Sequence, residues 1–222
     1  MKKHFLLTML LCMFSSFAVA SSEAELDHEK IPTDRASVLR GAEQTVTVCA
    51  GCHGLKYIQY RNLLELGVAK ETVDAWRGDN ALNTAIKSQM PADAAQAAFG
   101  VIPPDLSLMT LAREGGVHYM YSYLMGYKAN EKGEIENRIF TVTKMPDILG
   151  IAGATDAAQR AEIGAKAKDI AAFLNWAADP HAEDRKQLGI YVMIYLFIMT
   201  ILLFLWKKQI WRKVDAMGPV NL

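Results

Sequence analysis

Two cysteines and a histidine stand together in the run CAGCH, at residues 49–53. The C-x-x-C-H spacing places two thiols where they can form thioether bonds to the vinyl groups of a haem, with the adjacent imidazole beneath the iron. The pattern therefore predicts one haem c, attached covalently through Cys49 and Cys52, with His53 as an iron ligand.

Two other chemistries use closely spaced cysteines. A thioredoxin-like redox pair follows a strand and precedes a helix, whereas a helical pattern comes before this motif. A zinc site needs further cysteine or histidine ligands. The third cysteine, Cys12, lies in a segment expected to be removed, and the rest of the chain adds only His28, His118 and His181. Both alternatives are therefore weaker than a haem site.

The sixth coordination position of the iron separates electron carriers from proteins that bind a ligand. A methionine thioether is the expected sixth ligand, and residues 21–187 offer these methionines besides the three histidines: Met90, Met109, Met120, Met125 and Met145. Three of them lie in apolar helical patterns typical of a core. Met90 and Met145 both precede proline in loop-like sequence, where a stiff backbone can hold a side chain toward a cofactor. Spacing alone does not choose between them, although the place of Met145 before the final helix favours it.

Helices are the elements expected to position these residues. Apolar residues at helical spacing predict a helix over residues 37–48, capped by Ser37, so that the motif lies at a helix end. Two short helices are predicted at residues 107–113, capped by Ser107, and at residues 117–125, with a break at two glycines between them.

A long alanine-rich helix is predicted over residues 155–179. One apolar stripe on it is expected to pack on the haem-binding core, and it consists of Ile163, Ala167, Ile170, Leu174 and Ala177. Short helices joined by loops are expected over residues 54–98, a loop over 126–153 and an extended or loosely ordered arm over 21–32. Since no run of alternating β-branched residues competes with these patterns, the fold class is mainly α, a cytochrome c-like haem domain.

The two ends of the chain predict export and anchoring. Residues 1–20 combine a basic start, a short apolar run and a small-residue cleavage site, as a cleaved signal peptide does. Residues 188–207 are expected to form a transmembrane anchor helix, because the apolar run 189–206 has no charged side chain and is long enough to span a lipid bilayer. Four basic residues follow this run, at Lys207, Lys208, Arg212 and Lys213. The short tail 208–222 is therefore expected in the cytoplasm and the haem domain, residues 21–187, outside the bacterial inner membrane, in the periplasm.

A formal net charge of zero hides an acidic exported segment. Residues 21–187 carry 18 Lys/Arg and 23 Asp/Glu, because six basic residues and one acidic residue lie outside this segment. A charge of about −5 can steer a basic partner and speed encounter with it. No nucleic-acid partner is expected.

Several longer motifs resemble those of cytochrome c1, the c-type haem subunit of the ubiquinol:cytochrome c oxidoreductase, or cytochrome bc1 complex. The resemblance covers nearly all of the mature chain. Its marks include VCAGCH at 48–53, IPPDLS at 102–107, KMPDIL at 144–149 and the run FLNWAADPHAEDRKQLG at 173–189, which leads directly into the apolar C-terminal run. The short connection between residues 127 and 145 is typical of compact bacterial members.

This resemblance implies roles for particular residues. Met145, in the MP motif, would be the sixth ligand and Met90 structural, while Arg113 stands where the family places an arginine beside a haem propionate. The sequence departs from mitochondrial members near Phe99, where they carry asparagine, and at Asp147, where they carry proline.

The resemblance also implies partners. Electrons would arrive from the Rieske iron-sulfur subunit and leave to a soluble or anchored cytochrome c. The apolar helix would pack beside the cytochrome b subunit, within a dimer of the multi-subunit complex. Such a subunit has no substrate-converting site of its own.

Two other functions remain open at this point. The same haem chemistry would serve an anchored cytochrome that feeds a terminal oxidase or reductase, although the junction at residues 173–189 argues against it. A haem peroxidase or ligand sensor would require Met145 to be displaced from the iron.

Overall fold

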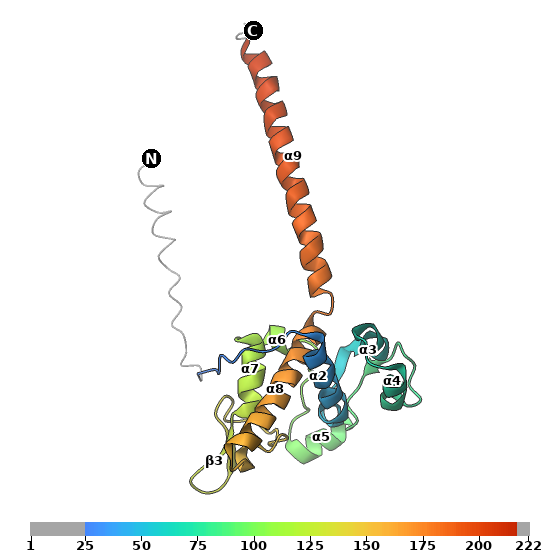
Figure 1. The fold of residues 1–222 in the computed structure, drawn as a ribbon, viewed down its shortest axis with the longest axis vertical. Coiled ribbons are helices and arrows are strands. Elements are labelled where there is room, and N and C mark those ends of the chain that lie inside the picture. Colours follow the sequence, from blue (N-terminus) through green and yellow to red (C-terminus); the bar gives the residue numbers. More distant parts are fainter. Residues whose placement is uncertain (1–24, 217–222) are drawn as a thin grey trace. The chain divides into compact units, whose positions relative to one another are not determined.

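The computed structural model describes residues 25–216, which fall into two compact units (Figure 1). The first unit runs to Ala178 and contains the CAGCH motif. The second begins at Asp179 and consists almost entirely of one helix. The expected signal peptide, residues 1–20, lies outside the described residues, as does the end of the C-terminal tail.

The first unit is mainly helical, as the sequence predicts. Its helices are α2 (Arg35–Thr47), α3 (Tyr60–Leu66), α4 (Lys70–Arg77), α5 (Ala92–Phe99), α6 (Met109–Ala112), α7 (Gly116–Met125) and α8 (Ala157–Ala178), with 3-10 turns η1 (Cys49–Gly51) and η2 (Ile151–Gly153). Its strands are β1 (Leu55–Gln59), β2 (Ala85–Ile86), β3 (Tyr127–Ala129) and β4 (Ile135–Asn137), which form two antiparallel pairs, β1 with β2 and β3 with β4.

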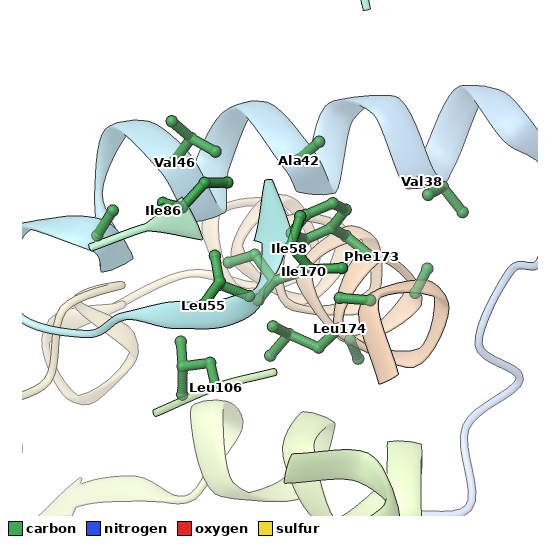
Figure 2. Packing of buried hydrophobic residues seen from close by; sticks show 14 of the residues in the cluster. Val38, Ala42, Val46, Leu55, Ile58, Ile86, Leu106, Ile170, Phe173 and Leu174 are labelled. Atoms are coloured by element: carbon green, nitrogen blue, oxygen red, sulfur yellow. The ribbon is translucent and has the colours of Figure 1, made fainter. Parts of the chain in front are cut away.

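Helices α2 and α8 pack side by side and carry the centre of the core (Figure 1). Apolar side chains from both helices and from strand β1 interdigitate between them, and Figure 2 shows Ala42, Ile58 and Phe173 among these. All five residues of the predicted stripe on the last helix of this unit are buried. The sequence prediction that this helix packs on the core is therefore confirmed.

Close contact between α2 and α8 depends on a glycine. A Cβ atom placed on Gly41 would lie 1.9 Å from the backbone oxygen of Asp169 and 2.8 Å from Cβ of Phe173. Arg40 donates to both carboxylate oxygens of Asp169, at 2.7 and 2.9 Å, and so fixes the same crossing point. The two backbones can therefore approach only where a side chain is missing.

Replacing Gly41 by alanine is expected to lower the free energy of unfolding by more than the about 1–3 kcal/mol typical of an overpacked core, because the clash is with backbone. Gly164→Ala is the matched control, since its nearest atoms would be ordinary side-chain contacts at 3.6 Å. That control is expected to stabilise α8 by roughly 0.5–1 kcal/mol. Thermal unfolding of the detergent-solubilised protein, followed by circular dichroism, measures both, and equal stability of the two variants would contradict the packing described.

Both predicted helix caps are wrong. Asp34, in extended conformation, caps α2, and its carboxylate accepts from the backbone N–H of Ser37 at 3.0 Å, so Ser37 lies in the first turn instead. Ser107 does not cap α6; its hydroxyl accepts from the backbone N–H of Tyr57 at 3.1 Å and joins two distant segments. In neither case does the serine hydroxyl cap the N-terminus of the predicted helix.

Two segments differ from the expected pattern of helices and loops. Strand β1 follows the CAGCH motif directly, where a helix was expected, and pairs with β2. The expected loop over 126–153 contains the hairpin of β3 and β4. Within the predicted N-terminal arm, the described residues 25–32 have no regular secondary structure, as expected, but they are not loose: the backbone N–H of Asp27 donates to Ser122 at 2.7 Å, and Lys168 pairs with Glu29 at 3.0 Å.

The second unit contains helix α9 (Ala182–Ala216). Its segment Ala182–Val214 has a window of mean hydropathy 2.6 and is long and apolar enough to cross a membrane. At about 1.5 Å of rise per residue, a helix of 33 residues is longer than the roughly 30 Å thickness of the hydrocarbon core of a bilayer. The apolar run predicted at 188–207 thus lies inside a longer helix, whose first turn carries Glu183 and Asp184.

Candidate haem site

All five residues singled out in the sequence line one cavity of about 630 Å3 in the first unit: Cys49, Cys52, His53, Arg113 and Met145. The volume lies in the range of about 300–1,000 Å3 typical of cofactor sites. Met109 and Met120 also line its wall, whereas Met90, Met125 and the three other histidines do not. The structure therefore brings together residues that are separated by almost a hundred positions in the chain.

The CAGCH motif folds as one tight turn after α2. Backbone N–H groups of Cys52 and His53 both donate to the carbonyl of Cys49, at 3.0 and 2.9 Å, which gathers the three side chains at one wall. A neighbouring segment holds the turn from outside, because the backbone N–H of Met90 donates to Gly51 at 3.1 Å. Met90 thus supports the motif through its backbone. Burial raises the pKa of the Cys49 thiol to about 11, so this thiol keeps its proton at neutral pH.

His53 is buried and oriented by one hydrogen bond. Its Nδ1 lies 2.6 Å from the carbonyl oxygen of Pro104. Because a carbonyl can only accept, Nδ1 carries the hydrogen, and Nε2 keeps its lone pair. Burial also lowers the pKa of His53, which favours the neutral imidazole. A neutral imidazole, fixed at one nitrogen and open at the other, is the form that ligates a metal.

The PPDLS segment is tied to the residues after the motif. Asp105 accepts from the backbone N–H of Lys56 at 2.8 Å and of Ser107 at 3.0 Å, so both carboxylate oxygens are used. Pro103 and Pro104 are thereby held at the cavity wall, and Pro104 presents its carbonyl to His53. The conformation of this loop sets the orientation of the imidazole.

Met145 lies in a loop that is fixed on both sides. Its backbone N–H donates to the hydroxyl of Thr143 at 3.2 Å, and its carbonyl accepts from Tyr127 at 3.0 Å. The carboxylate of Asp147 accepts from the backbone N–H of Gly150 at 2.9 Å and of Ala152 at 2.8 Å. Asp147, where the sequence departs from mitochondrial members, therefore stabilises the turn that follows Met145.

Arg113 is exposed and lines the cavity. Its guanidinium lies 5.9 Å from the ring centre of Tyr119, and among residues 25–216 it forms no ion pair with a carboxylate. A cation at the wall of a mainly apolar cavity, which Lys144 also lines, is suited to an anionic group on a bound molecule.

The remaining wall fits a flat apolar cofactor. It is formed mainly by aliphatic and aromatic side chains, among them Val48, Leu106, Met109, Met120, Leu124, Phe140, Ile148 and Leu174. Two thiols, one imidazole nitrogen and one thioether on such walls match the attachment and ligand groups of a haem c. The residues present therefore fit this cofactor.

Some cavity residues were not singled out from the sequence. Tyr119, Tyr123 and Thr143 line the cavity, and the sequence placed the first two only within the helix predicted at residues 117–125. Tyr119 and Tyr123 stand four residues apart in α7, a spacing that puts helical side chains on one face. In the sequence, that spacing was the sign that these two tyrosines share one location.

The model of the Cytochrome C1 family matches residues 28–214 of this chain. Cytochrome c1 of Rhodospirillum rubrum is 30% identical over 226 residues, which cover 82% of this chain and 83% of that protein. The ammonia monooxygenase gamma subunit of Nitrosomonas europaea is 29% identical over 236 residues, covering 96% of this chain and 99% of that one.

Cytochrome b/c1 of Bradyrhizobium diazoefficiens is 32% identical over 228 residues, which cover 80% of this chain but 33% of that longer protein. The match of the family model spans most of both described units, including the cavity residues and the apolar helix. The chain belongs to the cytochrome c1 family, the haem-carrying electron-transfer subunits of the membrane-bound cytochrome bc1 complex.

Proposed function

We propose that this chain carries one covalently attached haem c and relays single electrons from the Rieske iron-sulfur subunit to a soluble or anchored cytochrome c. The observation that carries the proposal is the meeting of two thiols, His53 and Met145 at one cavity. Haem, when bound, supplies a one-electron iron couple. The protein residues attach, orient and shield it.

Each residue has a distinct part. Cys49 and Cys52 would form the two thioether bonds, each by adding its S–H across a vinyl group, so no oxidant is needed. His53, fixed by the carbonyl of Pro104, would ligate through Nε2. Met145 would supply the second protein ligand, so that the iron would keep no position open for a substrate.

Arg113 would pair with a haem propionate. Arg113→Ala is then expected to lower the reduction potential on the order of tens of millivolts, because a nearby cation disfavours the more positive ferric state. Arg160→Ala is the matched control, since Arg160 is also exposed but does not line this cavity. Redox titration of the visible haem bands measures the reduction potential of both variants. Equal potentials would mean that Arg113 is a surface residue that does not pair with a propionate.

The rim of the cavity suits brief contact with redox partners. Five of the residues that line it are large, apolar and exposed: Val48, Val101, Phe140, Val142 and Ile148. Exposed apolar groups around a cofactor edge indicate a protein contact surface. They would let the Rieske subunit and the cytochrome c approach the same edge in turn.

The anchor would place this cavity outside the bacterial inner membrane. Four basic residues follow the apolar part of α9, at Lys207, Lys208, Arg212 and Lys213, and by the positive-inside rule they would remain in the cytoplasm. The haem domain would then lie in the periplasm and α9 beside the cytochrome b subunit. The longer Bradyrhizobium relative, cytochrome b/c1, whose name joins the two cytochromes, supports that proximity. We also propose that the complex is a dimer.

Carbon monoxide tests whether the sixth position is closed. The reduced wild-type protein at neutral pH is expected to bind no carbon monoxide, because Met145 occupies that position. A full carbon monoxide difference spectrum in the native protein would contradict electron carriage and favour a peroxidase or ligand sensor.

A further inference from the structure

The backbone of Met145 is part of a closed ring of hydrogen bonds. Its N–H donates to Thr143 Oγ1 at 3.2 Å, and its carbonyl accepts from the Tyr127 hydroxyl at 3.0 Å. The hydroxyl of Tyr123 closes the ring, at 2.5 Å from Thr143 Oγ1 and 3.2 Å from the Tyr127 hydroxyl. Tyr123, Tyr127 and Thr143, from α7, β3 and the loop after β4, therefore meet around the backbone of Met145.

Tyr127 is the donor in two of these contacts, to the carbonyl of Met145 and to the hydroxyl of Tyr123. Its single hydrogen is therefore shared between two acceptors, and the contact to Met145 is the shorter one. Thr143 Oγ1 accepts from the N–H of Met145, and either Thr143 or Tyr123 can donate in the contact between their hydroxyls. Both polar backbone groups of Met145 are thus held by side-chain hydroxyls.

The ring is shielded from water. Tyr127 is 4% exposed, and Tyr123 and Thr143 are half-buried at the cavity wall. Since water cannot easily replace a lost partner at these positions, removal of one hydroxyl leaves a neighbouring group unsatisfied. Fixing both the N–H and the carbonyl of one residue also restricts its two backbone dihedral angles.

We propose that this ring of Thr143, Tyr123 and Tyr127 is a positioning device that holds Met145 in its ligating conformation and keeps external ligands off the iron. The inference rests on the proposed function, in which Met145 is the sixth ligand. Ligation competes with a state in which the loop is detached. A loop already fixed in the bound conformation loses less conformational freedom on ligation, so the detached state is rarer.

Imidazole binding to the ferric protein measures the detached state. Imidazole can bind only where Met145 has left the iron, so its apparent affinity is proportional to the detached fraction. Tyr127→Phe removes one hydrogen bond of ordinary net strength and is expected to raise the apparent imidazole affinity about fivefold. Thr143→Val is expected to raise it similarly, whereas Thr143→Ser, which keeps the hydroxyl, is expected to behave as wild type.

Tyr121→Phe is the matched control. Tyr121 lies in α7, as Tyr123 does, and is 7% exposed, but its hydroxyl forms no hydrogen bond with residues 25–216. Its imidazole affinity is expected to equal that of wild type. Wild-type affinity in both Tyr127→Phe and Thr143→Val, or the same increase in Tyr121→Phe, would overturn the inference.

The methionine-to-iron charge-transfer band separates this failure from failure of the proposed ligand. Wild type and Tyr127→Phe are both expected to show the band without imidazole, and Met145→Ala is expected to lack it. If wild type lacks the band, the assignment of Met145 is wrong and the ring has no ligand to position. If the band is present but imidazole affinity does not respond, only the positioning role fails.

Discussion

Replacing Met145 by alanine is expected to lower the reduction potential by roughly 100–300 mV, a fraction of the about 0.8 V over which axial ligands set haem potentials. Loss of the thioether removes a ligand that favours ferrous iron and admits water to a cavity of about 630 Å3. The haem is expected to remain attached, because both thiols are intact. Redox titration gives the potential, and carbon monoxide is expected to bind the reduced variant.

Met90→Ala is the matched control for this change. Met90 also precedes proline, but its side chain does not line the cavity and its backbone N–H, which supports the motif, survives the substitution. Its potential is expected to match wild type. A normal potential in Met145→Ala, or a large fall in Met90→Ala, would refute the ligand assignment.

Replacing Cys49 and Cys52 together by alanine is expected to abolish covalent haem attachment. Each single variant keeps one thiol and is expected to yield much less attached haem, since two anchoring points on one tight turn become one. Haem staining of denaturing gels, compared with the amount of chain on the same gel, measures the attached fraction.

Cys12→Ala serves as the cysteine control, because Cys12 belongs to the expected signal peptide. Its haem stain is expected to equal that of wild type. Covalent haem in the double variant would exclude the thioether assignment at these two positions.

Much of the fold was predictable where one short-range pattern decided the structure. Helix α8 follows from its apolar stripe, whose members are buried against α2. Strand β1 was not predictable in this way. Its buried residues Leu55 and Ile58 stand three apart, a helical rather than an alternating spacing. The strand is held by hydrogen bonds from its backbone N–H groups to the side chains of Asp105 and Ser107, about fifty residues away.

The candidate site likewise has one part that local sequence predicts and one part that depends on contacts between distant segments. The residues at 49–53 form a local motif, so their meeting with one another needs no tertiary information. The orientation of His53 by Pro104 and the ring around Met145 depend on contacts between distant segments. Helical spacing places the rings of Tyr119 and Tyr123 on one side of α7, but which hydroxyl reaches which backbone group follows only from the packing of α7 and β3 against the Met145 loop.

Ubiquinol-driven reduction in the native complex tests the central claim most directly. The chain would be isolated from gently solubilised native membranes, the recovered subunits identified, and its haem spectrum recorded after ubiquinol is added. Recovery with a b-type haem subunit and a Rieske protein, and reduction of this haem by ubiquinol, is the predicted result. Recovery with a terminal oxidase instead, and a haem that ubiquinol leaves oxidised, would contradict its role in the cytochrome bc1 complex.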